Sequence, residues 1–471
     1  MSEEIQVPSP ALEWHRLVEK TLKGAPLESL NGSTPEGLAF KPLYDSPATA
    51  PGLDFAPRTL DRPWDLRAAS AHPDPARANA NLLEDLTGGA ASISLTIDPT
   101  GETGLAIGSV DDLGRALQGV ILDLAPVCME AGYLAPTVAD WLATLAKGSP
   151  AAPLHFHMDP LGTLARSGTS PGPIAAHLAQ ASAIAVRLSD IHPQAGLFLA
   201  SGRSVHEAGG GDAGEVAFAA ASALTYARAL VDAGLPMAQA WQGIHLGLAA
   251  DGDYFLTIAK LRAARALWGR MTRACGVTLP ARIEVRSSRR MLTVQDPWTN
   301  MLRLGAACAG AALGGADAII LGTFTDAMGL PTRFARRQSR NAQLVLMEEA
   351  HLGRVTDPAA GSGYIEALTD EIARAAWVQV QAIEAKGGLI AALEAGDIAA
   401  EVARVHAARL AEGKPGIVGV TAFPPEAQAP VEVDSAVRRP VSAPDPRQPG
   451  PDTHCPPLVP VRLAQMWETQ S

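Results

Sequence analysis

The sequence predicts a (β/α)8 TIM barrel, the closed ring of eight parallel strands in which a helix follows each strand. The chain has 471 residues, 47% of them hydrophobic and 18% charged, which is enough to bury a core of this size. From about residue 90, short β-rich runs alternate with long Ala- and Leu-rich helical stretches. Eight alternating units favour a parallel sheet that closes, and a doubly wound open sheet is the alternative.

The individual strands follow from short apolar runs that end at turn residues. The stretches 243–249 and 316–322 are almost continuously apolar, which is typical of parallel strands buried on both faces. We expect strands at Ser92–Ile97, Val120–Leu124, Leu154–Met158, Gly196–Ala200, Ile244–Leu248, Arg282–Val285, Ala318–Leu321 and Gly353–Val355.

The two ends of the chain differ from the barrel region. Residues 1–60 predict an N-terminal arm that wraps a partner, with a helix that starts near Pro10 and an extended, Pro-rich stretch after it. Residues 61–412 predict the barrel with its trailing helices. Residues 413–471 are Pro-rich and predict an extended tail, of which at most Val459–Trp467 would dock.

Composition excludes several classes of partner. The net charge of −11 argues against nucleic acid and anionic membranes, which both require a basic face. No apolar stretch is long enough to span a bilayer, and the first residues do not resemble a secretory signal. The four cysteines are scattered, without a disulfide or zinc pattern, so we expect a cytoplasmic protein without a structural metal.

Three basic or glycine-rich segments could contact a ligand. Arg286, Arg289 and Arg290 lie just past a predicted strand, at the end of the barrel where function resides, and are weak candidates for binding a phosphate-bearing substrate. The basic helix face 333–341 could hold an anion or a partner's carboxylates, although most such faces are solvated. The segment 357–364 is expected to follow the eighth strand, where small residues would let the backbone approach a ligand.

Two other pairs of polar residues have a chemical interpretation that we consider weak. Ser204 and His206 lie two residues apart, but without an acid behind the histidine they do not form a catalytic triad. His155 and His157 alternate on one strand and could begin a metal site. Such a pair without further ligands in motif spacing is more often polar core filling, so we expect no metal.

An ordered set of motifs resembles the methylmalonyl-CoA mutase family, from about residue 10 to about residue 425. The matching segments are Lys41–Tyr44, Arg62–Arg67, Phe255–Trp268, Asp296–Arg303, Arg340–Glu349 and His351–Pro358. The resemblance implies a barrel that is threaded by the CoA chain and faces a separate cobalamin-binding domain. Homolysis of adenosylcobalamin in that family starts the radical interconversion of methylmalonyl-CoA and succinyl-CoA.

The sequence departs from the catalytic members at the positions that the family uses for chemistry. Catalytic chains carry Gly-Tyr-His-Met-Gln-Glu-Ala-Gly, whose His donates a hydrogen bond to the thioester. Arg203 stands here at the Tyr position and Ser204 at the His position, with His206 two positions further on. A second Tyr, which sits against cobalamin and substrate in the family, is replaced by Ala69.

The cobalamin-binding motif is also not matched. We expect no cobalamin domain in this chain, and we interpret Asp190-Ile191-His192 and Asp452-Thr453-His454 as chance matches to its Asp-x-His motif.

The resemblance therefore implies a non-catalytic small subunit in a heterodimer with the catalytic large subunit. No residue of this chain would be catalytic, and adenosylcobalamin would be bound by the partner chain. Two alternatives remain open. One is an active acyl-CoA mutase barrel that uses a cobalamin domain on a separate chain, with His206 at the thioester. The other is a CoA-ester-binding regulatory module that uses Arg286, Arg289 and Arg290.

Overall fold

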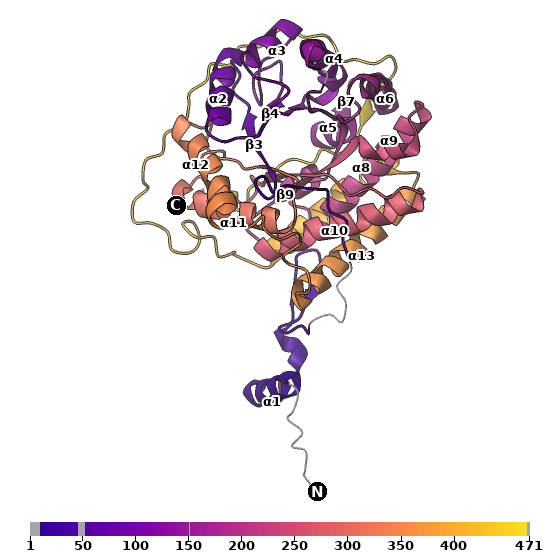
Figure 1. Cartoon of the computed structure of the whole chain (residues 1–471). Helices are drawn as coiled ribbons and strands as arrows, with labels where there is room; N and C mark the ends of the chain where they lie inside the picture. The colour runs from indigo at the N-terminus through magenta and orange to yellow at the C-terminus, as the bar shows by residue number, and fades with distance from the viewer. Residues whose placement is uncertain (1–9, 46–51, 150, 469–471) are drawn as a thin grey trace.

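Eight parallel strands form a closed ring at the centre of the molecule (Figure 1). The structure is a computed structural model that describes residues 10–45, 52–149 and 151–468. The ring closes because β11 pairs in parallel with both β10 and β3, and this confirms the predicted barrel over the open sheet. In spatial order the strands are β10 (Ile283–Ser287), β11 (Ala318–Ile320), β3 (Asp65–Ser70), β4 (Ser92–Thr96), β5 (Val127–Glu130), β6 (Leu154–Met158), β8 (Gly196–Ser201) and β9 (Ile244–Ala250).

Six of the eight predicted strands coincide with strands of the ring, and two predictions are wrong. The run Val120–Leu124 forms a turn region ahead of β5, and its Leu124 is 70% exposed. Gly353–Val355 forms no strand. The first strand of the ring is instead β3, which was not predicted because its inward side chains are charged. Asp65 and Arg67 form an ion pair, so β3 lacks an apolar run.

Helices cover the outside of the ring, as Figure 1 shows. Their buried faces are rich in alanine, which allows close packing; most of the buried residues of α8 are alanines. The helices that follow strands are α2 (Pro75–Thr87), α3 (Val110–Ala116), α4 (Ala135–Leu145), α5 (Pro160–Ser167), α6 (Ile174–Ile191), α7 (Arg203–Glu207), α8 (Asp212–Asp232), α9 (Met237–Gln242), α10 (Tyr254–Ala274), α11 (Asn300–Leu313) and α12 (Arg333–Leu344). The trailing helices are α13 (Gly363–Ala385), which packs on α8 and α10, α14 (Leu389–Glu394) and α15 (Asp397–Ala411).

The N-terminal arm stands apart from the ring. It consists of α1 (Pro10–Leu22), a short 3-10 turn and the hairpin of β1 (Gly32–Ser33) and β2 (Ala39–Phe40). In Figure 1, α1 lies clear of the barrel. The hairpin turn anchors the arm, because the Glu36 carboxylate accepts backbone hydrogen bonds at the N-terminus of α8. Residues 46–51 of the predicted extended stretch lie outside the described residues.

The C-terminal tail forms a belt, defined here as residues 434–468, around the carboxyl ends of the strands. Its backbone N–H groups donate to carbonyls in the loops and short helices that follow β11, β4, β6, β8 and β10, in the order of the strands round the ring. The pairs are Asp434 with Leu330, Val441 with Pro99, Gln448 with Pro171, Cys455 with Gly168, Leu458 with Ala165, Val461 with Glu207 and Leu463 with Arg290.

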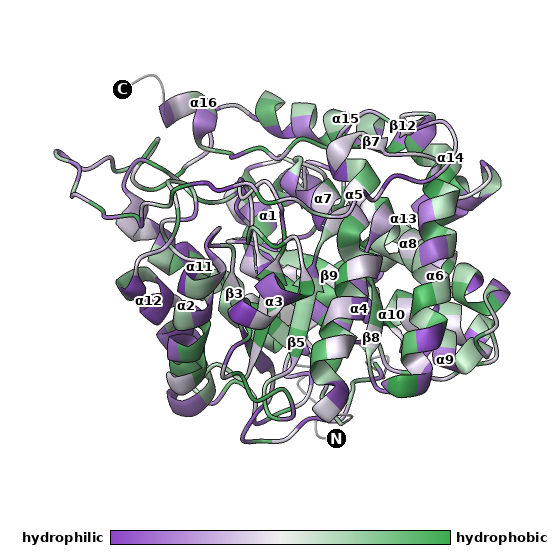
Figure 2. Ribbon diagram, turned by 90° about the horizontal axis from the view of Figure 1, so that it is seen from above, coloured by the Kyte–Doolittle hydropathy of each residue, from purple (hydrophilic) through white to green (hydrophobic). Residues whose placement is uncertain are grey.

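Short elements within the belt lie along one end of the barrel. They are β12 (Thr453–His454), which pairs with β7 (Thr169–Ser170), and α16 (Gln465–Glu468), and Figure 2 shows both. The tail is extended as predicted, but the expectation that at most Val459–Trp467 docks is wrong. Prolines keep this chain extended and leave the intervening N–H groups to bond with the loops. Among the described residues, no helix is both long and apolar enough to cross a membrane.

Candidate functional site

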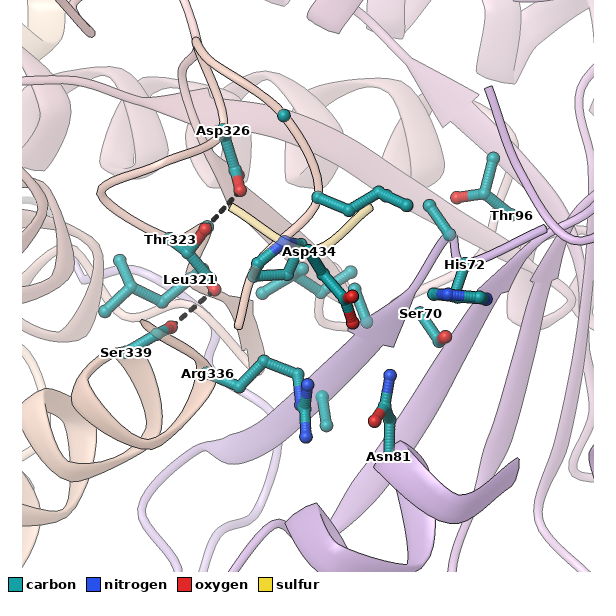
Figure 3. Close-up of a pocket in the computed structure, with 18 of the residues that line it drawn as sticks. Ser70, His72, Asn81, Thr96, Leu321, Thr323, Asp326, Arg336, Ser339 and Asp434 are labelled. Carbon is teal, nitrogen blue, oxygen red and sulfur yellow. Dashed lines mark hydrogen bonds between the residues drawn. The ribbon is translucent and has the colours of Figure 1, made fainter. Parts of the chain in front are cut away.

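A cavity of about 690 Å³ lies at the carboxyl ends of β3, β4, β10 and β11. This is the end of a TIM barrel that normally carries function, and the volume suits a small organic ligand. Figure 3 shows Ser70 and His72 on one side, and Thr323 and Asp326 from the loop after β11 on the other. Asp434 of the belt also contributes to the wall.

The cavity brings together several of the residues singled out from the sequence. Ala69, Arg286 and Arg289 all line it. The Arg286 guanidinium is paired with Glu130, at 2.7 Å between Nη2 and Oε1. Arg289 is exposed and donates from Nη2 to the backbone carbonyl of Asp326 at 2.5 Å. Arg289 is therefore the more exposed of the two arginines, and the nearby Asp326 carboxyl partly offsets its charge.

Arg203 and Ser204 do not line this cavity. Arg203 turns into the barrel and donates to Glu130, at 3.1 Å between Nη2 and Oε1. The Ser204 hydroxyl accepts from Arg166 Nη1 at 3.4 Å, whereas His206 contacts carboxylates on other elements. The geometry thus excludes a Ser204–His206 nucleophilic pair.

His206 is enclosed in a buried cluster of charges beneath α7. Its Nδ1 lies 3.1 Å from Glu215 Oε2, and its Nε2 lies 3.6 Å from Asp251 Oδ2. The Lys260 ammonium joins Glu215 at 2.7 Å and Asp212 at 2.8 Å. Burial alone would raise the pKa of Glu215, but Lys260 and His206 lower it from 4.5 to about 2. We call His206, Asp212, Glu215, Asp251 and Lys260 the Lys260 cluster. The contacts within this cluster hold the His206 side chain away from the cavity.

Arg290 belongs beside this cluster and not with Arg286 and Arg289. Its Nη2 lies 2.7 Å from Asp251 Oδ2, and its Nη1 donates to the backbone carbonyls of His206 and Gly210. The side chain is buried. Arg290 is therefore separated in space from Arg286 and Arg289, although the three are close in sequence. Its side chain turns toward α7 and Asp251, whereas the other two line the cavity.

The bore of the barrel is filled by ion pairs in two layers. In the layer nearer the amino ends of the strands, Arg67 binds Glu284 at 2.5 Å and Asp65 at 2.7 Å. In the layer nearer the carboxyl ends, Arg203 and Arg286 both bind Glu130. Burial opposes ionisation of Glu130, but the two arginines hold its pKa well below the ordinary value.

The large cavity reaches both layers, because Arg67, Glu130 and Arg286 are among its lining residues. A cavity of about 10 Å³ remains beside His157 and Arg203. This is close to the least volume that holds one water molecule. Side chains of the two ion-pair layers thus cross the ring at the floor of the large cavity.

The basic face 333–341 reaches the cavity, because Arg336, Ser339 and Arg340 are among its lining residues, the first two of which Figure 3 shows. Arg336 and Arg340 of the basic face 333–341 pair with Asp85 on α2, so the carboxylates they hold belong to this chain. The segment 357–364 does not follow the eighth strand, which is β11, and it does not line the cavity. Its Asp357 pairs with Arg262 on α10 instead. The expectation of a ligand loop there is wrong because Gly353–Val355 was mistaken for the last strand.

Sequence reasoning missed the loop that does follow β11. Gly322, Thr323 and residues 326–331 line the cavity, and Asp326 accepts from the Thr323 hydroxyl at 2.5 Å. Burial raises the pKa of the Asp326 carboxyl. The polar run Thr323–Asp326, directly after the apolar strand, was the signal that could have identified this wall.

In the part of the chain that the structure describes, three groups of side chains have ligand atoms close enough together for a metal ion. They are His155, His157 and His245; Cys128, His157 and Glu284; and His206, Asp212 and Glu215. The second group already binds the Arg67 guanidinium through Glu284, and the third binds the Lys260 ammonium. The first group joins the predicted pair His155 and His157 to a histidine that the sequence pattern did not connect with them.

The two near-matches to a cobalamin motif lie in ordinary structural positions. His192 is buried at the end of α6 with its ring against Phe156. His454 lies in β12, paired with β7.

Comparison with known proteins gives consistent matches over nearly the whole chain. Residues 57–443 match the family model described as methylmalonyl-CoA mutase. The chain is 39% identical over 456 residues to the methylmalonyl-CoA mutase small subunit of Streptomyces virginiae, covering 91% of this chain and 72% of that protein. It is 34% identical over 446 residues to the small subunit from Propionibacterium freudenreichii subsp. shermanii, with 88% and 68% covered. The methylmalonyl-CoA mutase of Escherichia coli (strain K12) is 30% identical over 454 residues, with 87% and 64% covered.

Proposed function

The chain belongs to the methylmalonyl-CoA mutase family, and we propose that it acts there as the non-catalytic small subunit of a heterodimer with a catalytic large subunit. The large subunit would bind adenosylcobalamin and interconvert methylmalonyl-CoA and succinyl-CoA. This chain would contribute by binding the folded partner and stabilising it by mass action. The names of the relatives at 34% to 39% identity support a small-subunit role.

The observation that carries the proposal is the filled bore. A barrel that is threaded by a CoA chain needs an open axis, and here Arg67, Glu284, Arg203 and Glu130 occupy it. Opening the axis would break buried ion pairs, and leaving one partner of such a pair alone costs about 3–5 kcal/mol. That cost makes threading of a substrate through this ring unfavourable.

The residues at the family's catalytic positions support the same conclusion. Ala69 lines the cavity without a ring or hydroxyl to offer a ligand. Ser204 is paired with Arg166, and His206 is held in the Lys260 cluster. The alternative of an active barrel with His206 at the thioester therefore requires a side chain that is fully buried and engaged elsewhere.

The residues of this chain do not fit adenosylcobalamin. The position that carries an aromatic ring against cobalamin in catalytic members is Ala69. The belt also crosses the same end of the barrel, where Val461 and Leu463 bond to the loops after β8 and β10. We therefore assign the cofactor to the partner chain and derive no chemical step through it here.

The N-terminal arm is the segment that we expect to clasp the partner. Helix α1 stands clear of the barrel in Figure 1, and its Leu17 is 50% exposed. An amphipathic helix gains its stability from packing its apolar face, and a partner surface would supply that packing. The four cysteines are unpaired, which fits assembly in the reducing cytoplasm.

Co-expression with a tagged large subunit tests the proposal. We expect the two chains to co-purify and to turn over methylmalonyl-CoA with adenosylcobalamin, whereas this chain mixed with an isolated cobalamin domain should give no turnover. Leu17→Asp should weaken co-purification, and Leu124→Asp, which alters a leucine that is 70% exposed and lies far from the arm, is the control. Turnover without a large subunit, or failure to pair with one, would overturn the proposal.

A CoA-ester-binding regulatory module is the second candidate, and the cavity with its exposed Arg289 favours it. Titration of the isolated chain with succinyl-CoA separates the two. Binding that is weakened about tenfold by Arg289→Ala would favour the regulatory module; no binding would leave the scaffold role.

A further inference from the structure

Three histidines meet inside the barrel near the amino ends of its strands. His155 and His157 come from β6, and His245 comes from β9. His157 Nε2 lies 3.1 Å from His245 Nδ1, and the His155 and His245 ring centroids are 5.0 Å apart. One ring nitrogen from each histidine lies within 4.8 Å of the other two. One ring nitrogen of each histidine therefore borders one small space, in which His155 Nδ1 accepts the backbone N–H of Gly196 at 3.2 Å.

The backbone around this space has features that create it. Strand β8 stands between β6 and β9 and begins with Gly196, where a Cβ atom would lie 3.0 Å from His155 Nδ1 and 2.9 Å from His245 Nδ1. The absence of a side chain there keeps the space open. A register shift in β6 and the positive φ of 44° at His157 turn its ring toward His245. A non-glycine residue in this conformation is strained, and such strain is often found at ligand sites.

The distances suit a metal ion. Zinc binds imidazole nitrogens at about 2.0–2.1 Å, which in a tetrahedron places two ligands about 3.3 Å apart, close to the spacing of His157 and His245. His157 Nδ1 has no hydrogen-bond partner and lies 3.7 Å from Glu284 Oε2. A metal on Nε2 would fix the proton on Nδ1, facing that carboxylate.

The other two candidate groups differ from this one in a decisive respect. Each of them already holds a cationic side chain, Arg67 in one and Lys260 in the other. Within residues 10–45, 52–149 and 151–468, no lysine or arginine makes a hydrogen bond or ion pair to the three imidazoles. His155 is only partly buried, so an ion can enter from the amino-terminal mouth of the barrel.

We propose that His155, His157 and His245 bind one divalent transition-metal ion in the bore. Three neutral imidazoles with a fourth position left for water are a donor set typical of Zn²⁺. The ion replaces the proton that the facing nitrogens of His157 and His245 otherwise share, and it joins β6 to β9 across β8. This site is independent of the proposed small-subunit role, because it lies in the bore and not on a partner surface.

The test uses the tag-free full chain, stripped with a chelator and titrated with Zn²⁺ by calorimetry. We expect one ion per chain and a rise in melting temperature on binding. Co²⁺ in place of Zn²⁺ should give the visible absorption of a four-coordinate site. His155→Asn, chosen because this ring is partly exposed and its loss should not prevent folding, is expected to weaken binding at least tenfold. His15→Asn on the exposed face of α1 is the matched control and should bind as the wild type does.

A second variant does not remove a ligand. Gly196→Ala places a methyl group against two of the three nitrogens and should also weaken binding at least tenfold, with circular dichroism confirming the fold. Absence of Zn²⁺ binding by the wild type would overturn the proposal. So would binding that both His155→Asn and Gly196→Ala leave unchanged, because that ion would sit elsewhere.

Discussion

Replacing Glu215 by glutamine tests the conclusion that His206 sits in a structural cluster. Glu215 is fully buried, and its carboxylate contacts Lys260, His206 and the backbone N–H of Ala249. A pKa lowered from 4.5 to about 2 corresponds to about 3 kcal/mol of stability at neutral pH. Glu215→Gln keeps the shape and the bond from Ala249 but removes the charge, so it should lower the free energy of unfolding at pH 7 by about 3 kcal/mol.

The pH dependence gives the sign of the effect. A lowered carboxyl pKa contributes stability that is present above pH 4.5 and is lost as the pH falls toward 2. The difference between wild type and Glu215→Gln should therefore shrink over that range in urea unfolding. Glu401→Gln, which alters an exposed glutamate paired with Arg404, is the control and should cost less than about 1 kcal/mol. A Glu215→Gln loss no larger than the control's would refute the reasoning.

Three further changes have defined outcomes. Arg67→Met leaves the buried Glu284 and the partly buried Asp65 without their cationic partner and should destabilise the barrel by about 3–5 kcal/mol in urea unfolding; a smaller loss would argue that the bore is not held by these pairs. Burial and Asp212 raise the pKa of Glu36 to about 7, so wild-type stability should fall as the pH rises from 4.5 through 7, and Glu36→Gln should abolish that fall in thermal unfolding from pH 5 to 8. Val461→Pro removes the N–H that docks the belt and should lower stability by about 1–3 kcal/mol, whereas Val459→Pro, at a position without a backbone bond, should not; equal effects would mean that the bond does not hold the belt.

The strands that could be predicted from the sequence are those whose side chains are apolar on both faces. Strands β9 and β11 belong to this class, because they are buried between the bore and the helices. Strand β3 could not be found in this way, since Arg67 points into the bore and its partner Glu284 lies far along the chain. The charged side chains that point into the bore leave β3 without an apolar pattern. The same side chains form the ion pairs that cross the axis of the barrel.

The site was predicted only in part for a similar reason. Ala69 and Ser204 were identified by resemblance alone, because single positions carry no physical pattern. The environment of His206 depends on Lys260 and Glu215, whose contacts with it are set by the fold and not by spacing. His245 joins the histidines of β6 only because the ring places β9 near them across β8.

The most direct test of the central claim is a turnover assay with defined subunits. Methylmalonyl-CoA and adenosylcobalamin are supplied to this chain with an isolated cobalamin domain, to the large subunit alone, and to the reconstituted pair. The filled bore and the enclosed His206 predict no turnover in the first mixture and turnover in the pair. Succinyl-CoA formed by this chain without a large subunit would contradict the account.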